Sequence, residues 1–276
     1  MNKVSHTPQP LSLTSSLVKS AKRFFDRWTS PFVIGLVLLV WMGVSYYQLL
    51  PPIDLPGPSL VWKTMQGLWQ HGYAGQSMML NISISVFRIA LGFGLSVIFG
   101  VLVGLLMGRS HIIFRAIDPI LQFIRPVPPL AYIPLLVVWL GIGEAPKIVL
   151  ILLGTLPIIV ISTSAAVHKT PENRVRVAQC LGANNTQIFW RVIFPSALPD
   201  ILTSMRVAVA AAWGSLVAAE MIAASAGMGW MIEVAGHEAN VPVIFVGIVL
   251  IGLWGYTMEL LIRALEGKLV PWRTHQ

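Results

Sequence analysis

Long apolar runs separated by short polar stretches set the pattern of this chain. Six of these runs approach or exceed the roughly 20 residues that a helix needs to cross a bilayer. They predict membrane-spanning helices at 31–50, 82–107, 118–143, 148–167, 201–224 and 242–262. The pattern therefore predicts an all-α membrane protein with six transmembrane helices.

Polar segments flank this predicted membrane domain, 31–263. Residues 1–30 contain a basic and aromatic cluster at 19–28 that suits an amphipathic helix on the lipid headgroups. The first apolar run is too long for a signal-peptide core, and no small-residue cleavage site follows it, so it predicts an uncleaved span. Residues 264–276 form a short tail. Membrane lipid is thus an expected partner.

The positions of the Lys and Arg residues give the orientation. Under this topology the inner segments hold fourteen of them and the outer loops hold two, Lys63 and Lys147. The inner residues are Lys3, Lys19, Lys22, Arg23, Arg27, Arg109, Arg115, Lys169, Arg174, Arg176, Arg191, Arg263, Lys268 and Arg273. An excess of basic residues marks the cytoplasmic side, so both termini are expected in the cytoplasm.

Composition agrees with a membrane protein and excludes several function classes. Hydrophobic residues make up 55% of the 276 positions and charged residues 11%. The orientation explains the net charge of +8 without a nucleic-acid partner. A single cysteine excludes an internal disulfide, and the six histidines lack metal-ligand spacing. No P-loop or other catalytic motif is present, so we expect no catalytic residue, no metal and no cofactor in this chain.

Two of the predicted spans carry special patterns. Small residues recur every fourth position along one face of 82–107 and just beyond it, at Gly92, Ser96, Gly100, Gly104 and Gly108. Such a face predicts close approach of another helix backbone. The span 118–143 is interrupted by Pro126, Pro128, Pro129 and Pro134. Its broken part is expected to face protein or a water-filled path, because lipid does not satisfy free backbone carbonyls.

A polar, basic segment at 170–200 separates the fourth and fifth spans. Thr170 is predicted to cap a helix that begins with Pro171 and Glu172. Gly182 then offers a left-handed stop, Asn184 or Asn185 caps a second short helix, and Pro195 ends it. The apolar positions of both helices recur at helical spacing and require a partner. One interpretation is an amphipathic loop lying on lipid headgroups.

The same segment resembles the EAA loop of bacterial ABC importer permeases. The matching residues are Ala178-x3-Gly182 followed by Val192-Ile193-Phe194-Pro195. Arg176 stands where that family usually has Glu, and Val177 replaces the first Ala. The phrase RPVPPLAYIPLLVVWLGIGE, at 125–144, resembles the taurine branch of the taurine, sulfonate and nitrate permeases.

This resemblance implies a type I ABC importer permease fold in the bacterial inner membrane. It also implies that the chain imports taurine or a similar small sulfonate, with alkanesulfonates or nitrate as alternatives. The implied partners are a second copy of the chain, two ATPase subunits that bind the ATP, and a periplasmic substrate-binding protein. Contact with the ATPase is expected at Arg176, Val177, Ala178, Leu181, Gly182, Ala183 and Asn184.

Charges inside apolar spans are candidates for the substrate path, because they are costly unless they face a pathway or a partner. The expected path residues are Arg125, Pro128, Tyr132, Trp213 and Glu220. Arg125 could attract an anionic sulfonate or pair with Asp118 or Glu220. Glu220 could meet a substrate ammonium or pair with a neighbouring helix. Arg88 either joins this group or lies at the outer interface.

Two other classes of protein are less consistent with the pattern. A secondary transporter driven by an ion gradient would not need the long capped segment at 170–200, and inverted repeats are not evident. A membrane-embedded enzyme or scaffold would need a catalytic constellation or a sizeable soluble domain, and neither is evident in the sequence.

Overall fold

The computed structural model describes residues 32–33, 35–51 and 53–272. The chain divides into two compact units, Met1–Leu60 and Val61–Gln276. In the first unit the indole nitrogen of Trp41, in the apolar helix Gly35–Tyr46, donates a hydrogen bond to the carbonyl of Pro56 at 3.1 Å. The expected amphipathic helix within 1–30 lies outside the described residues, as does part of the first expected span. Both stay predictions.

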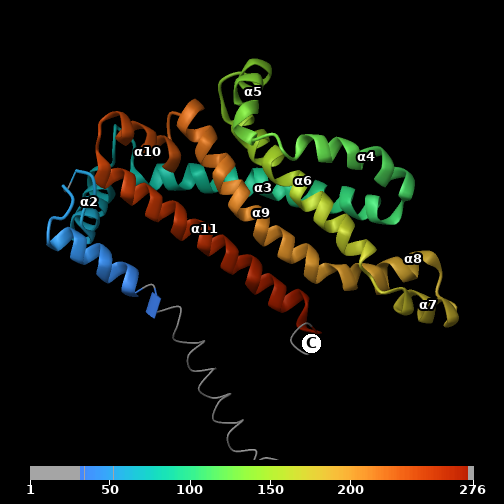
Figure 1. The fold of residues 1–276 in the computed structure, drawn as a ribbon. Coiled ribbons are helices and arrows are strands. Elements are labelled where there is room, and N and C mark those ends of the chain that lie inside the picture. The colour runs from blue at the N-terminus through green and yellow to red at the C-terminus, as the bar shows by residue number, and fades with distance from the viewer. Residues whose placement is uncertain (1–31, 34, 52, 273–276) are drawn as a thin grey trace, which may run out of the picture. The chain divides into compact units, whose positions relative to one another are not determined.

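Helices make up nearly all of the second unit (Figure 1). As far as residue 168 the helices are α2 (Pro58–His71), α3 (Met78–Arg109), α4 (His111–Ile124), the 3₁₀ turn η1 (Pro129–Tyr132), α5 (Ile133–Leu140) and α6 (Glu144–His168). They are followed by α7 (Glu172–Cys180), α8 (Asn185–Ile188), the π turn η2 (Phe189–Ile193), α9 (Phe194–Ala223), α10 (Met228–His237) and α11 (Val241–Leu269).

Four helices in the described part of the chain are long and apolar enough to cross a membrane. They are α3, α6, the continuous helix Asn185–Ala223 and α11. A fifth candidate is the bent pair His111–Ile124 and Pro129–Leu140, whose two arms meet at 91°. The break lies at residues 125–128, where the sequence places the first two of its clustered prolines. The all-α membrane fold expected from the sequence is confirmed.

The small-residue face of α3 packs directly on α6, as the four-residue spacing predicts. A Cβ atom on Gly100 would lie 2.8 Å from Ile159, and one on Gly104 would lie 2.5 Å from Thr163. Between these glycines and the start of α3, Thr155 donates a hydrogen bond to the Ser96 hydroxyl at 2.6 Å. Since the partner of each residue lies 59 positions further along the chain, the two helices run parallel. The small residues on this face of α3 therefore let the two backbones lie close together.

The expectation that Pro195 ends a short helix is wrong. The chain stays helical from Asn185 to Ala223, and Pro195 lies in the first turn of α9. The preceding turn, η2, is a π turn, in which the Phe194 N–H donates to the carbonyl of Phe189. A proline ring normally clashes with the carbonyl four residues earlier, and the wider π turn relieves this clash. The helix therefore continues past Pro195, from the polar segment into the span.

A tyrosine hydrogen bond links the turn before α3 to the end of α10. The Tyr73 hydroxyl donates to the carboxylate of Glu238. Burial, together with this carboxylate, raises the pKa of Tyr73 from its usual 10.0 to about 12. A raised pKa means that the stabilising contribution is complete below pH 10 and is lost as the pH rises through 12.

We expect Tyr73→Phe to remove this pH dependence. At pH 7 the substitution should cost no more than about 1 kcal/mol, since the hydrogen bond is partly exposed to solvent. Between pH 10 and 12 the difference in melting temperature between wild type and Tyr73→Phe should shrink. Thermal melts of both proteins in detergent across this range would measure it. A constant difference would show that the hydrogen bond does not titrate.

Candidate functional site

The polar segment at one end of the bundle forms two short helices around a glycine turn. Gly182 has a φ of +80°, in the left-handed region, and it ends the first helix as predicted. Asn184 caps α8: its side chain accepts from the Gln187 N–H at 2.9 Å, and the Gln187 side chain accepts from the Asn184 N–H at 3.0 Å. Thr170 does not cap α7, which begins one residue later than expected, with Pro171 at the cap position.

We call the unit formed by α7, the Gly182 turn, α8 and η2 the coupling segment, because its resemblance to the EAA loop implies an ATPase contact. Its first helix buries no residue, and the side chains of Val177 and Leu181 are 60% and 82% exposed. Arg176 forms an exposed ion pair with Glu172 at 2.7 Å, one turn back on the same helix. Every residue expected to contact an ATPase therefore lies on α7 or in the turn to α8, and two of them expose large apolar side chains.

Aromatic packing anchors the second half of the coupling segment in the bundle. Phe189 is 7% exposed and belongs to a buried cluster with Leu105 of α3, Val167 of α6 and Ile201 of α9. The Arg109 guanidinium, at the end of α3, lies 5.3 Å from the centroid of the Phe189 ring. Through Phe189, η2 thus packs against three spans at once.

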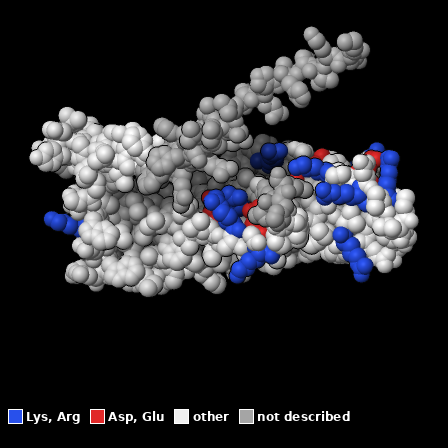
Figure 2. Space-filling model, turned by 90° about the horizontal axis from the view of Figure 1, so that it is seen from below, with Lys and Arg blue, Asp and Glu red and all other residues white. Residues whose placement is uncertain are grey.

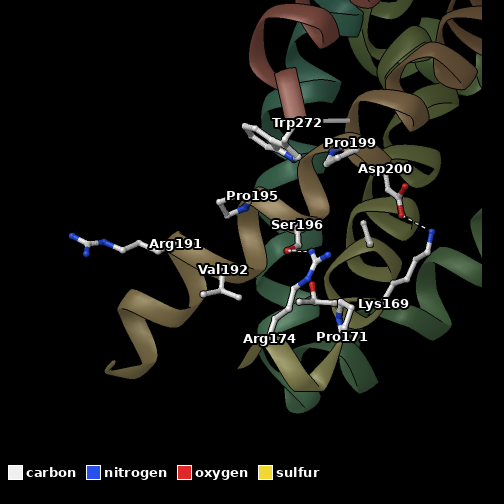
Figure 3. Close-up of a pocket in the computed structure, with 12 residues that line it drawn as sticks. Lys169, Pro171, Arg174, Arg191, Val192, Pro195, Ser196, Pro199, Asp200 and Trp272 are labelled. Carbon is white, nitrogen blue, oxygen red and sulfur yellow. Dashed lines mark hydrogen bonds and ion pairs between the residues drawn. The ribbon is translucent and has the colours of Figure 1, made fainter. Parts of the chain in front are cut away.

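A polar cavity of about 550 Å³ lies at the base of the coupling segment (Figure 3). Two bonds cross-link its walls: Lys169 pairs with Asp200 at 2.9 Å, and Arg174 donates to the Ser196 hydroxyl at 3.2 Å. Arg191 also lines it, and its side chain points away from the other labelled residues in Figure 3. Figure 2 shows basic side chains gathered towards this end of the second unit. These charges suit an acidic or lipid-headgroup surface.

The substrate-path candidates do not form one group. Glu220 is fully buried and Trp213 is 7% exposed, both in α9, whereas Arg125 is exposed at the end of α4. Pro128 is exposed and Tyr132 half-buried, at the break between α4 and α5. The ion pairs considered for Arg125 with Asp118 or Glu220 do not form among the described residues, and Glu220 pairs with Arg88.

A charge network closes the end of the bundle opposite the coupling segment. Arg88 of α3 is 2% exposed, so its side chain faces protein and does not extend into solvent. It donates to Glu220 of α9 at 2.8 Å and to both oxygens of Glu144, at the start of α6, at 2.5 and 2.7 Å. Lys147 reaches Glu144 at 3.0 Å. Two cations and two carboxylates from three spans therefore balance one another.

Backbone groups at the start of α10 complete this network. The N–H groups of residues 227–229 donate in turn to the side chains of Asn81, Ser85 and Glu220 at 2.8–2.9 Å. Gly227 has a φ of +136°, and a Cβ there would lie 2.5 Å from the Glu220 carboxyl group. Only glycine fits this position. The helix start thus stabilises the buried carboxylate and is held by it.

Nothing in the sequence pattern singles out Glu144, Lys147 or Ser85 as members of this network. The sequence does contain one signal for the network: Arg88 and Glu220 carry opposite charges, and each lies within an apolar run. Buried charges require partners, so the two could be expected to pair. A second pair was also missed: Arg206 of α9 contacts Glu259 of α11 at 3.0 Å. Helical periodicity shows which residues share one face of a helix, but not which other helix packs against that face.

The long apolar helices define an integral membrane protein. The chain belongs to the family of binding-protein-dependent transport system inner membrane components, whose model matches residues 96–271. It is therefore a permease subunit of an ABC importer in the inner membrane. It is non-catalytic, and its partners are ATPase subunits and a substrate-binding protein.

Individual relatives agree with this family. The chain is 40% identical over 240 residues, 87% of each chain, to the taurine transport system permease protein TauC of Escherichia coli. It is 33% identical to the putative aliphatic sulfonates transport permease protein SsuC of Bacillus subtilis, over 87% of this chain and 85% of the relative. It is 29% identical to the nitrate import permease protein NrtB of Synechocystis, over 86% of this chain and 87% of the relative.

A solved structure supports the fold. The MetNI methionine ABC transporter in inward-facing conformations matches with a TM-score of 0.54 and 19% identity. The match covers 75% of this chain and 98% of that chain. At this identity the likeness establishes the ABC importer permease fold and carries no information on the transported solute.

Proposed function

We propose that this permease carries taurine or a similar small sulfonate. The observation that supports this substrate most directly is the 40% identity to the Escherichia coli taurine permease over 87% of both chains. The aliphatic sulfonate and nitrate permeases match over similar lengths at 33% and 29% identity. Alkanesulfonates and nitrate are accordingly the alternative substrates within the same architecture.

The coupling segment is the proposed contact with the ATPase. Its first helix contains no buried residue, while η2 packs among three spans through Phe189. On ATP binding, closure of two ATPase subunits would push two such segments together and tilt the attached spans from inward to outward access. This mechanism requires two permease copies, so we propose a homodimer. ATP is bound by the partner subunits.

A transporter reconstituted in liposomes tests the function. The components are this chain, its ATPase and its binding protein, and the readouts are ATP hydrolysis and uptake of labelled taurine. We expect uptake to require all three components. Uptake by this chain alone under an ion gradient would overturn the ABC mechanism. ATP-dependent uptake of nitrate or alkanesulfonates without taurine would overturn only the substrate.

The glycine turn gives a sharper test of coupling. Proline at position 182 cannot adopt a φ of +80°, and it removes the N–H that donates to the Gln179 carbonyl at 2.9 Å. We expect Gly182→Pro to misplace α8 relative to α7 and to lower taurine uptake at least tenfold, a loss of about 1.4 kcal/mol or more in docking. Co-purification of the ATPase should fall in parallel.

Gly75 provides the matched control for this substitution. It too has a φ of +80°, and it lies in the turn before α3, far along the chain from the coupling segment. Gly75→Pro introduces the same backbone conflict, and we expect it to leave ATPase association unchanged. If the two variants lost association equally, general misfolding would explain the result and the coupling role of the turn would be rejected.

A further inference from the structure

A second cavity lies at the end of the bundle opposite the coupling segment. Its volume is about 790 Å³, and its walls come from α5, the first turn of α6 and the end of α9. The apolar part of the lining includes Val137, Ile142 and Ile222, and Ser225 lies in the loop after α9. Beneath it, Ile133 and Leu136 of α5 pack on α6 and α9, so the cavity has a fixed floor.

Two opposite charges lie side by side in this cavity wall. Lys147 has a side chain that is 5% exposed, and its ammonium is 3.0 Å from a carboxylate oxygen of Glu144. The Glu144 side chain is 49% exposed. Both residues line the cavity. The wall therefore offers one nearly buried cation and one accessible carboxylate within a single helical turn.

The charge network behind the cavity holds this pair in place. Arg88 donates hydrogen bonds to both carboxylate oxygens of Glu144, and it also donates to the buried carboxylate of Glu220, which holds it in place. Ser85 and the Gly229 N–H hold Glu220 in turn, at 2.7 and 2.8 Å. The Glu144 carboxylate is thus preorganised on helices rather than on a mobile loop, which lowers the entropic cost of using it as a ligand group.

The balance of charge selects the kind of ligand. Arg88 and Lys147 offset Glu144 and Glu220, so a solute with a net charge would unbalance this network. A bare anion would also meet the Glu144 carboxylate next to the Lys147 ammonium. A solute that carries both an ammonium and an anionic group can instead bind Glu144 with its ammonium and Lys147 with its anionic group. The total charge of the site then stays unchanged.

We propose that this cavity is a low-affinity site for a small zwitterionic sulfonate, with Lys147 binding the sulfonate and Glu144 binding the ammonium. The proposal rests on the proposed function and makes it more specific. It places a solute contact on the permease itself, at the face remote from the ATPase. It also gives a physical reason for this permease to prefer taurine to nitrate or to an alkanesulfonate that lacks an amine.

Protection of an introduced thiol tests the site. In a Cys180→Ser background, Ser225→Cys places a thiol in the cavity lining with little change in size. The full-length chain, purified with its ATPase partner, is labelled with a water-soluble maleimide in the presence and absence of taurine. A site occupied two-thirds of the time reacts at about one third of the free rate, so we expect about threefold protection at millimolar taurine.

Three controls define the result. Gln70→Cys, which is exposed on α2 and does not line the cavity, should be labelled at the same rate with and without taurine. Lys147→Met should remove the protection, whereas Lys147→Arg should retain part of it, because the second variant keeps the charge. Propanesulfonate and nitrate, at the same concentration as taurine, should protect much less.

The outcomes separate this proposal from the proposed function. Equal protection by propanesulfonate and taurine would overturn the role of Glu144 and the zwitterion assignment. Absence of protection in a transporter that imports taurine would overturn the site and leave the function standing. Failure of the complete transporter to import taurine would overturn the function, whatever the labelling shows.

Discussion

Replacing Glu220 by alanine should destabilise the folded state by about 3–5 kcal/mol, the usual cost of breaking a buried ion pair. The substitution leaves the N–H of Gly229 and one donor of Arg88 without their acceptor in the interior of the bundle. Glu220 is 0% exposed, so water cannot replace the lost oxygens easily. Thermal melts and monodisperse yield in detergent would measure the effect.

Two comparisons test whether charge imbalance causes this loss. The double variant Arg88→Met, Glu220→Leu removes one cation together with the carboxylate. It should destabilise the folded state less than Glu220→Ala alone, because Glu144 keeps Lys147 as its partner. Glu233→Ala is the matched single control, since this residue of α10 forms only a partly exposed pair with His237. Equal losses at positions 220 and 233 would contradict the importance of the buried network.

Gly104→Leu should separate α3 from α6 and produce the second large loss. A Cβ at this position would lie 2.5 Å from the Cβ of Thr163 and 2.7 Å from the backbone carbonyl oxygen of Val160. A backbone carbonyl in the middle of a helix cannot move aside, so the whole interface must open. Overpacking of this kind costs about 1–3 kcal/mol, and leucine adds further atoms beyond Cβ.

Gly94→Leu gives the control for helix propensity and added apolar surface. It lies on the same helix, and a Cβ there meets no atom within 4 Å. We expect this variant to melt at or above the temperature of the wild type, because leucine favours the helix over glycine. If Gly94→Leu and Gly104→Leu melted alike, the close α3–α6 packing would not limit the stability of the bundle.

The features that the sequence predicted well are those encoded locally. The four-residue recurrence of small side chains identified the contact face of α3, because side chains four apart share one side of a helix. Gly182 and Asn184 marked the end of α7 and the start of α8, because the left-handed conformation and the cap bond are properties of single residues and their immediate neighbours.

The features that escaped prediction depend on contacts between helices or on irregular backbone. Arg88 and Glu220 were recognised separately as costly charges. The spacing of residues along the sequence does not predict that α3 contacts α9, or that Glu144 lies beside the two charges. Pro195 was expected to stop a helix, and the π turn before it removed the steric reason for stopping. The cavity beside Lys147 requires three chain segments, so it could be found only in the structure.

The parallel packing of α3 and α6 also determines the direction in which the chain passes through the bundle in each later helix. Since both helices run in the same direction, the chain must travel back from the end of α3 to the start of α6 through α4, η1 and α5, despite the bend of 91°. Contacts of Leu150 and Ala219, in one buried cluster, and of Arg206 with Glu259 continue the alternation into α9 and α11. From α3 to α11 the chain therefore traverses the bundle an odd number of times, which places the start of α3 and the end of α11 at opposite ends of the bundle.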